Sequence, residues 1–336
     1  MAKRRISEQQ KRRIAELQQQ RRLKAKSNSS QKEKQLSGQG LGDEQSGQVI
    51  SHFGQSLIIE DAEKKLFRCV ARQNIGALVC GDNIIWQQAS DKEGVIVAVK
   101  ERQSLLQKPG FGGKLKPMAA NIDQIVIVSS LTPEPKAYLI DRYLVAAENL
   151  PATAIILLNK IDLLNTENKE KIKTLEHEYN NIGYPLIKAS NINNEGFDEL
   201  HQALKNKTSI FVGLSGVGKS SLIMHLLPEH DIRIGDLSAA TGEGKHTTTS
   251  SMLYHLPCGG KLIDSPGVRD FGLWNSSADD ILYGFKELRP FIGHCKFSNC
   301  SHKHEPGCAI LAALERGDIS AQRYEHYQKM IDEYAV

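Results

Sequence analysis

Long hydrophobic segments are missing from this chain of 336 residues. A helix that crosses a membrane needs roughly 20 consecutive apolar residues, and no run in the sequence approaches that length. The N-terminal residues are charged and no apolar stretch follows them, which excludes an ordinary export signal. We therefore expect a cytoplasmic protein without membrane partners, long enough for two or three domains.

Cysteines are scarce and unevenly placed, with 6 in the chain. Three stand apart, whereas Cys295, Cys300 and Cys308 lie close together among histidines. Disulfides are rare in the cytoplasm, so this clustering favours a metal site over disulfide bonds. The spacing C-x4-C-x-H-x5-C supplies enough ligands for a closed tetrahedral site.

We predict that one structural Zn2+ is bound by Cys295, Cys300, His302 and Cys308. His304 is also within reach and would replace His302 only if the loop geometry demanded it. His294 is a weaker alternative. An unmetallated thiol cluster or a redox site is the competing interpretation.

Positive charge is concentrated in the first 45 residues. They contain 12 Lys and Arg against 5 Asp and Glu and so carry +7, whereas the whole chain carries +4. Apolar residues are few there, so we predict that residues 1–45 form a disordered basic arm. Such an arm suits contact with phosphate backbones, and a solvated tail that only aids solubility is the alternative.

Short apolar runs separated by turn residues follow in residues 46–115, and they favour a small all-β barrel of the OB type. Barrels of this type often bind single-stranded or looped RNA, although a protein-binding or purely structural barrel fits the pattern nearly as well. Lysines and glycines in Leu105–Met118 predict a flexible basic linker after the barrel. The predicted strands are Gly47–Phe53, Ser56–Glu60, Leu66–Val70, Ala77–Val79, Asn83–Ala89 and Gly94–Val99.

Strands and helices alternate in residues 116–273. An apolar strand at Ile122–Ser130, a helix at Lys136–Glu148 and another apolar strand at Thr153–Leu158 predict a parallel sheet covered by helices. A later apolar run at Ile210–Val212 leads into the glycine-rich stretch Gly213–Ser221, and a helix follows. The expected architecture is an α/β domain preceded by the barrel.

The glycine-rich stretch matches G-x-x-x-x-G-K-S in full. Backbone N–H groups of such a loop, together with the positive end of the next helix, bind phosphates. Lys219 adds a charge for the outer phosphates and Ser220 can ligate Mg2+. A glycine-rich turn with Lys-Ser by chance is the alternative. The predicted phosphate-binding residues are Gly213, Leu214, Ser215, Gly216, Val217, Gly218, Lys219, Ser220 and Ser221.

The strand at Thr153–Leu158 is followed by Asn159-Lys160-Ile161-Asp162, an N-x-x-D pattern with lysine second. A carboxylate beyond a strand end can accept both the ring N1–H and the exocyclic amine of guanine, which adenine does not offer together. We assign Asp162 to this role, Asn159 to the guanine edge and the Lys160 stem to the base face. The pattern is weak alone and gains weight beside a phosphate loop.

The polar segment Ser238–Ser251 has the composition of a nucleotide-sensing switch, in which a threonine hydroxyl closes on Mg2+ while the γ-phosphate is present. Thr248 and Thr249 are equal candidates, and a mobile loop without that role is the alternative. Asp264 can hold the water shell of Mg2+ and the Gly267 N–H can meet the γ-phosphate.

The residue after Gly267 is Val268, which cannot orient a water molecule as a polar side chain would. Another group must therefore place the attacking water, and His246 is the nearest candidate in the sequence. Lys219 and His246 are thus the predicted catalytic side chains.

The base motif precedes the phosphate loop, the switch threonines and Asp-x-x-Gly, which inverts the Ras-type order and indicates a circularly permuted GTPase domain. With the barrel and the cysteine segment, the chain resembles the bacterial small-subunit-dependent ribosome biogenesis GTPases. That resemblance implies GTP hydrolysis to GDP stimulated by the small ribosomal subunit, rRNA contact and a zinc-binding helical domain at 274–336. It also supports His246 as the residue that positions water.

Two other functions compete with this interpretation. The chain could be an RNA-binding assembly protein in which nucleotide is structural and turnover incidental. A small-molecule or nucleoside kinase with the same phosphate loop conflicts with Asp162 and the Asp-Ser-Pro-Gly turn. We expect a monomer in solution.

Overall fold

The computed structural model describes residue 36 and residues 40–53, 56–109, 115–227, 251–265, 272–273 and 276–335. The chain divides into two compact units, Met1–Glu101 with Arg233–Ser250, and Arg102–Ile232 with Ser251–Val336. Within the described residues, no helix is both long and apolar enough to cross a membrane.

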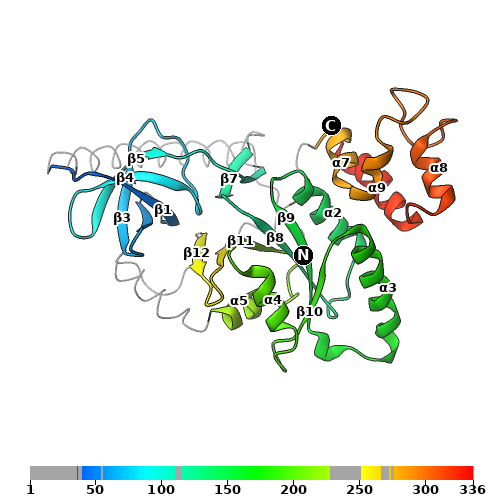
Figure 1. Ribbon diagram of the computed structural model, residues 1–336, viewed down its shortest axis with the longest axis horizontal. Helices are drawn as coiled ribbons and strands as arrows, with labels where there is room; N and C mark the ends of the chain where they lie inside the picture. The colour runs from blue at the N-terminus through cyan, green and yellow to red at the C-terminus, as the bar shows by residue number, and fades with distance from the viewer. Residues whose placement is uncertain are drawn as a thin grey trace, which may run out of the picture. The chain divides into compact units, whose positions relative to one another are not determined.

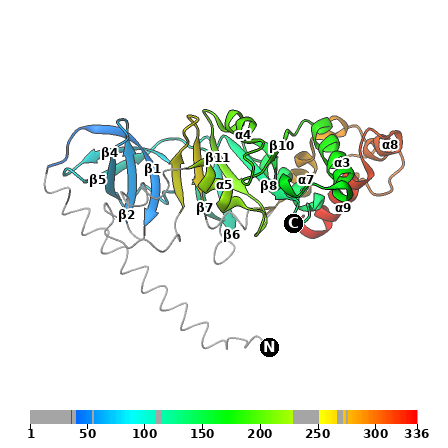
Figure 2. The ribbon, with the colours of Figure 1, turned by 90° about the horizontal axis from the view of Figure 1, so that it is seen from below.

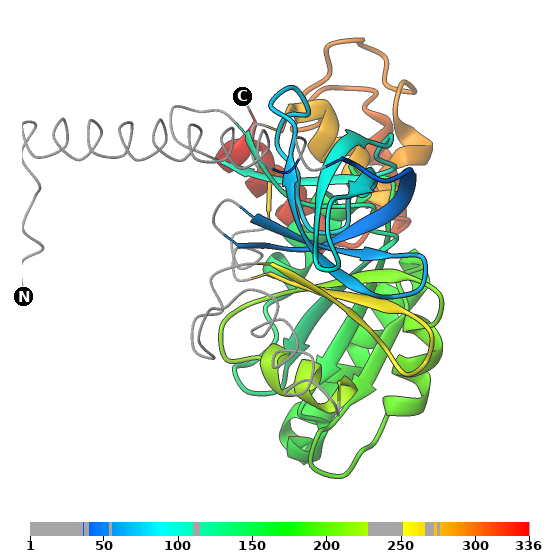
Figure 3. The ribbon, with the colours of Figure 1, turned by 90° about the vertical axis from the view of Figure 1, so that its left-hand side faces the viewer.

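A closed barrel forms the first unit. Its strands follow the order β1-β2-β3-β5-β4, and β4 returns to pair with β1; Figure 3 shows the blue and cyan strands curving around one another. Closure leaves no open sheet edge, and the interior is filled by apolar side chains such as Trp86 and Ile59, both 0% exposed. The strands are β1 Glu44–Phe53, β2 Ser56–Asp61, β3 Leu66–Ala71, β4 Asn83–Gln88 and β5 Glu93–Val99.

The strand predicted at Ala77–Val79 is wrong, because that segment is irregular. Its backbone is satisfied locally: the Val79 N–H donates to the Asp82 carboxylate at 2.8 Å, and Asp82 is 0% exposed. A turn stabilised by an aspartate side chain thus replaces the strand ladder here.

Part of the predicted basic arm packs on the barrel. Leu36 is 4% exposed and belongs to a cluster with Val70 and Val95, and β1 already begins at Glu44. The disorder predicted for residues 1–45 therefore does not extend to Gln45, and the rest of the arm lies outside the described residues.

A six-strand sheet organises the second unit, in the order β10-β9-β8-β11-β13-β12. All neighbouring strands are parallel except β12, which runs antiparallel to β13. Every residue of β8 is buried, as expected for a strand covered on both faces. The strands are β8 Gln124–Ser130, β9 Thr153–Asn159, β10 Leu186–Ala189, β11 Thr208–Val212, β12 Met252–His255 and β13 Lys261–Asp264.

Four helices cover this sheet, and crossover handedness assigns their faces. The chain steps from β8 to β9 to β10 in one direction and then returns to β11, so right-handed crossovers between these parallel strands place the first two helices on one face and the third on the other. Figure 1 shows α2 beside α3, and α4 beside α5. The helices are α2 Ala137–Glu148, α3 Thr166–Ile182, α4 Phe197–Leu204 and α5 Lys219–Leu226.

The linker predicted at Leu105–Met118 is wrong. Strands β6 Leu105–Pro109 and β7 Leu115–Ala120 pair antiparallel within the second unit. Leu106 and Ala119 face each other in this pairing and are 2% and 0% exposed. Their burial outweighs the glycines and lysines on which the linker prediction rested, and it moves the boundary of the first unit from 115 to Glu101.

The C-terminal segment consists of helices that cluster with the second unit. Figure 2 shows α7, α8 and α9 gathered beside α3, and the Ser320 hydroxyl, at the start of α9, donates to Glu178 of α3 at 2.6 Å. The elements are α7 Ala278–Gly284, the 3-10 helix η4 Lys286–Phe291, α8 Ala309–Arg316 and α9 Ala321–Tyr334.

A buried charge cluster fastens α9 to α2. Asp141, on α2 and 0% exposed, accepts hydrogen bonds from Tyr179 at 2.6 Å and from His326 at 2.5 Å, and it forms an ion pair with Arg323. Arg323 is 1% exposed and also donates to both oxygens of Glu287, at 2.6 and 3.0 Å. Burial, followed by the charge of Asp141, raises the pKa of Tyr179 well above its ordinary value, so this phenol stays a donor.

Removing one carboxylate from this cluster should destabilise the protein strongly. Asp141→Ala leaves the buried guanidinium with one carboxylate partner, and breaking a buried ion pair costs about 3–5 kcal/mol. Urea unfolding followed by far-UV circular dichroism measures the change. Glu170→Ala, at a carboxylate that is 78% exposed, is the control and should cost under about 1 kcal/mol. Equal losses in the two variants would show that the cluster does not hold the fold.

Candidate functional site

The loop between β11 and α5 depends on glycine. Gly213, Gly216 and Gly218 have φ values of 142°, 85° and 92°, which L side chains rarely adopt. A Cβ on Gly213 would lie 2.2 Å from the Val128 carbonyl oxygen, and one on Gly218 would lie 2.3 Å from the Asn159 amide nitrogen. The loop therefore runs tightly between β8 and the end of β9.

Lys219 begins α5 and folds back over this loop. Its Nζ donates to the carbonyl oxygens of Gly213 at 2.7 Å and Leu214 at 2.6 Å. Ser220 and Ser221 are exposed in the first turn of the helix. The first turn of α5 thus presents the Lys219 ammonium, backbone N–H groups and the exposed hydroxyls of Ser220 and Ser221. The ammonium and N–H groups suit a phosphate, and the hydroxyls suit a bound Mg2+.

The base motif, residues 159–162, is hydrogen-bonded to the phosphate loop. Asn159 ends β9 and its Nδ2 donates to the Val217 carbonyl at 2.9 Å. Lys160, at φ 63°, donates from Nζ to the carbonyl oxygens of Gly216 at 2.7 Å and Thr132 at 2.5 Å. The structure therefore shows both side chains bracing the loop, whereas the sequence assigned them to the guanine edge and face.

Asp162 is held in place by Ser190, through a hydrogen bond that the sequence did not predict. Ser190 follows β10, is 0% exposed and donates its hydroxyl to Asp162 Oδ1 at 2.5 Å. The Ser190 hydroxyl oxygen in turn accepts the Ile192 N–H at 3.1 Å, which fixes the direction of the hydroxyl. Because β10 pairs with β9, with Ala189 opposite Asn159, Ser190 falls beside the base motif. A serine directly after that strand was the available signal.

Asp264 lies at the same edge of the sheet as the phosphate loop. It ends β13, whose Ile263 pairs with Ile210 of β11, so Asp264 follows that pair on the strand next to the one that leads into the loop. The Ser251 hydroxyl donates to Ser265 at 2.7 Å and ties together the ends of β12 and β13. The other predicted switch residues, His246, Thr248, Thr249, Gly267 and Val268, lie outside the described residues.

The four predicted metal ligands come together before α8. Their ligand atoms all lie within 4.8 Å of one another, and neither His304 nor His294 belongs to the group. The Sγ atoms of Cys295 and Cys308 are 3.9 Å apart, and His302 Nδ1 lies 3.5 and 3.4 Å from them. A tetrahedral zinc site has edges of roughly 3.8 Å between sulfurs and 3.6 Å between nitrogen and sulfur. The cluster can therefore hold a tetrahedral metal ion.

Residues around the cluster fix its loop. Glu305 accepts from the Ser301 N–H and hydroxyl at 2.7 and 2.5 Å and from the His304 N–H at 3.1 Å. These bonds lower the pKa of Glu305 far below its ordinary value, the Ser301 hydroxyl first among them. The His302 carbonyl accepts from Tyr324 at 2.6 Å and from Gln328 at 3.2 Å, both on α9.

The protonation of two ligands suits a metal. Burial lowers the pKa of His302, which keeps its imidazole neutral and able to ligate. Burial and the hydrogen bonds with Cys308 and Cys295 raise the pKa of the Cys300 thiol to about 12. Crowded thiols of this kind lose their protons together only when a cation compensates the charge.

The sequence profile of the RsgA GTPase family matches residues 99–274. The "Small ribosomal subunit biogenesis GTPase RsgA" of Hahella chejuensis is 49% identical, with 98% of this chain and 96% of that protein aligned. The protein of the same name from Pseudomonas aeruginosa is also 49% identical, over 98% of both chains. The chain belongs to the RsgA GTPase family. It is therefore a GTPase.

Two solved structures share its fold. YjeQ from Thermotoga maritima has a TM-score of 0.71 at 33% identity and covers 87% of this chain and 98% of its own. YloQ, described as a circularly permuted GTPase, has a TM-score of 0.70 at 28% identity and covers 87% and 95%. These likenesses extend across most of this chain.

The sheet shows how the RsgA-family chain is permuted. The order of strands in space places β11, with the phosphate loop, between β13 and β8, while the base motif follows β9. Along the chain β8, β9 and β10 come before β11 instead of after it. The permuted order predicted from the motifs is confirmed, and the site stays whole because strand pairing does not depend on where the chain is cut.

Ser190→Ala should weaken guanine nucleotide binding. The hydrogen bond to Asp162 contributes about 1.5–3 kcal/mol as a bond to a charged acceptor, so we expect the dissociation constant of GDP to rise by roughly 10- to 150-fold. Fluorescence titration with a labelled GDP measures it. Asn193→Ala, in the same loop but bonded to Glu195 rather than Asp162, is the control. Unchanged affinity in Ser190→Ala would remove Ser190 from the base site.

Proposed function

We propose that this GTPase hydrolyses GTP to GDP and phosphate during late maturation of the small ribosomal subunit and uses the cycle to time its release from that particle. The hydrogen bonds that join Asn159 and Lys160 to the phosphate loop carry the nucleotide part of the proposal. The relatives' name, "Small ribosomal subunit biogenesis GTPase", supports the partner.

The described residues suggest a division of labour at the nucleotide. Backbone N–H groups of the loop and Lys219 hold the phosphates, and Asp162, oriented by Ser190, selects guanine. Ser220, Asp264 and either Thr248 or Thr249 provide oxygens for Mg2+, which neutralises charge on the outer phosphates when bound.

Water positioning is assigned to His246. Val268 occupies the place after Asp-x-x-Gly where a polar residue would orient the nucleophile, and valine offers no hydrogen bond. His246 lies beside the candidate magnesium threonines in the sequence and can accept or donate at neutral pH.

The remaining parts are proposed as docking surfaces. The barrel and the zinc-binding segment 274–336 would contact rRNA of the small subunit, and the basic arm would add contacts to phosphates. The metal is proposed to be Zn2+ with a purely structural role, because four protein ligands leave no open position. The protein is proposed to act as a monomer.

Cys300→Ala should release the metal. The purified wild-type protein is expected to contain about one zinc per chain by atomic emission, whereas the variant with three ligands should lose most of it on dialysis. Cys258→Ala, at a cysteine outside the cluster, should keep its zinc. Stoichiometric zinc in Cys300→Ala would remove Cys300 from the ligand set.

The proposed partner is tested by GTP turnover with purified ribosomal subunits. Small subunits should raise the rate at least tenfold over the protein alone, large subunits should not, and ATP should not be hydrolysed under either condition. His246→Ala should lose the stimulated rate while binding GDP normally. Stimulation by neither subunit would contradict the proposed partner and leave the assignment as a GTPase intact.

A further inference from the structure

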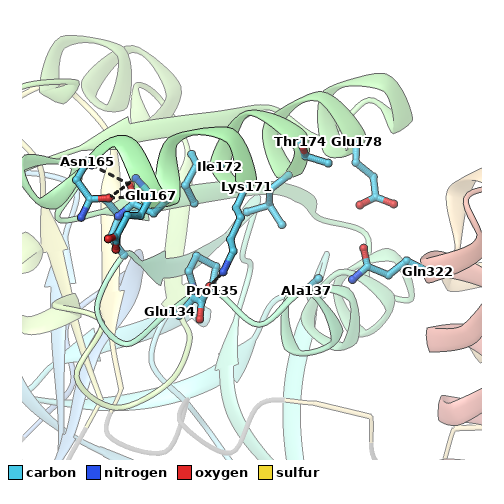
Figure 4. Close-up of a pocket in the computed structure, with 13 residues that line it drawn as sticks. Glu134, Pro135, Ala137, Asn165, Glu167, Lys171, Ile172, Thr174, Glu178 and Gln322 are labelled. Carbon is cyan, nitrogen blue, oxygen red and sulfur yellow. Dashed lines mark hydrogen bonds and ion pairs between the residues drawn. The ribbon is translucent and has the colours of Figure 1, made fainter.

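A groove in the second unit is unrelated to either site described above. Its volume is about 600 Å3, and it lies between the loop before α2, the exposed face of α3 and the start of α9. Figure 4 shows Asn165 and Glu167 at one end and Glu178 with Gln322 at the other. The floor contains Leu131 and Ile172, which are 8% and 5% exposed, with Leu175 beside them.

The charged residues of the groove form a row along one helix face. Glu167, Lys171, Thr174 and Glu178 follow the spacing i, i+4, i+7, i+11 on α3, which places them on the same side of the helix. Lys171 crosses the groove to Glu134 at 3.1 Å and is neutralised there (Figure 4). In the described part of the chain neither Glu167 nor Glu178 forms an ion pair, so each end of the groove keeps a negative charge.

These charges determine the class of ligand. Three carboxylates against one ammonium repel a nucleic-acid backbone, so this surface does not face rRNA phosphates. A cationic ligand with an apolar part fits both the carboxylate ends and the apolar floor. The side chain of Gln322 makes no hydrogen bond within the described residues and projects beside Glu178, where it can bond to a main-chain group of a ligand (Figure 4).

The separation of the carboxylates sets the length of the ligand. Glu167 and Glu178 are eleven positions apart on α3, which is about 16 Å at a rise of 1.5 Å per residue. An extended chain spans that distance in about five residues. We propose that the groove binds an extended basic segment of a partner protein, with two cationic side chains about five residues apart and an apolar side chain between them.

The test uses a fluorescein-labelled peptide with two arginines about five residues apart and leucine between them. It is titrated with the full GDP-loaded chain and followed by fluorescence anisotropy. Wild-type protein should bind it saturably, and more weakly as salt is added. The double variant Glu167→Gln with Glu178→Gln should raise the dissociation constant by roughly five- to tenfold, since two exposed ion pairs are lost. Both glutamines can still accept hydrogen bonds, including the one from Ser320 to residue 178.

Two controls separate the groove from general acidity of the surface. Glu170→Gln removes a carboxylate from the same helix that does not line the groove, and it should leave binding unchanged. Glu178→Lys should weaken the arginine peptide and restore binding of a peptide with glutamate at one cationic position. Labelled GDP binding should be the same in all variants, because none of these residues belongs to the nucleotide site.

Three results would overturn the proposal. The first is no saturable binding to the wild-type chain at peptide concentrations up to about 1 mM, where ΔG is only about −4 kcal/mol. The second is equal affinity for wild-type protein and the double variant. The third is binding only after removal of residues 1–35, which would make the chain's own basic arm the occupant of the groove.

Discussion

The amide of Asn159 donates to the carbonyl of Val217, and the rest of the nucleotide site depends on this contact. It joins residues 58 positions apart, and it is possible only because β8 holds β9 and β11 at a fixed spacing and because Gly218 has no Cβ in its way. Lys160 adds a second tie to Gly216. The base motif and the phosphate loop are consequently joined into one structure, so we expect a change in either to alter both nucleotide affinity and base selection.

Circular permutation changes what lies beyond this structure. The chain leaves the sheet after β13, and its C-terminal helices return to α2. They are fixed there by Asp141 and Arg323, which are buried to 0% and 1% exposure. Helix α2 in turn follows the loop containing Thr132, whose carbonyl accepts from Lys160. The segment 132–141 therefore has two attachments. At one end Thr132 contacts Lys160, which also holds the phosphate loop, and at the other end Asp141 contacts Arg323 of α9.

The sequence predicted those features that follow from local pattern. The phosphate loop needs glycines at fixed positions, the metal cluster needs ligands at fixed spacing, and buried parallel strands are apolar throughout, so each is readable from neighbouring residues. The hydrogen bond of Ser190 and the role of Asp141 were missed because they depend on partners distant in the chain, Asp162 and Arg323. The composition of Leu105–Met118 led to a wrong prediction. Its lysines and glycines suggest a linker, but the segment forms paired strands in which Leu106 and Ala119 are buried.

The loop that carries the four predicted metal ligands is hydrogen-bonded to two helices, α8 and α9. Cys308 is the N-cap of α8, where its sulfur accepts the Leu311 N–H at 3.5 Å. On the other side the His302 carbonyl accepts from Tyr324 and Gln328 of α9. The sheet shares none of these bonds, and its parallel pairing is complete without them. A metal ion held by this cluster would therefore set the position of α8 relative to α9, while the loop between β11 and α5 keeps its geometry through β8, β9 and β11.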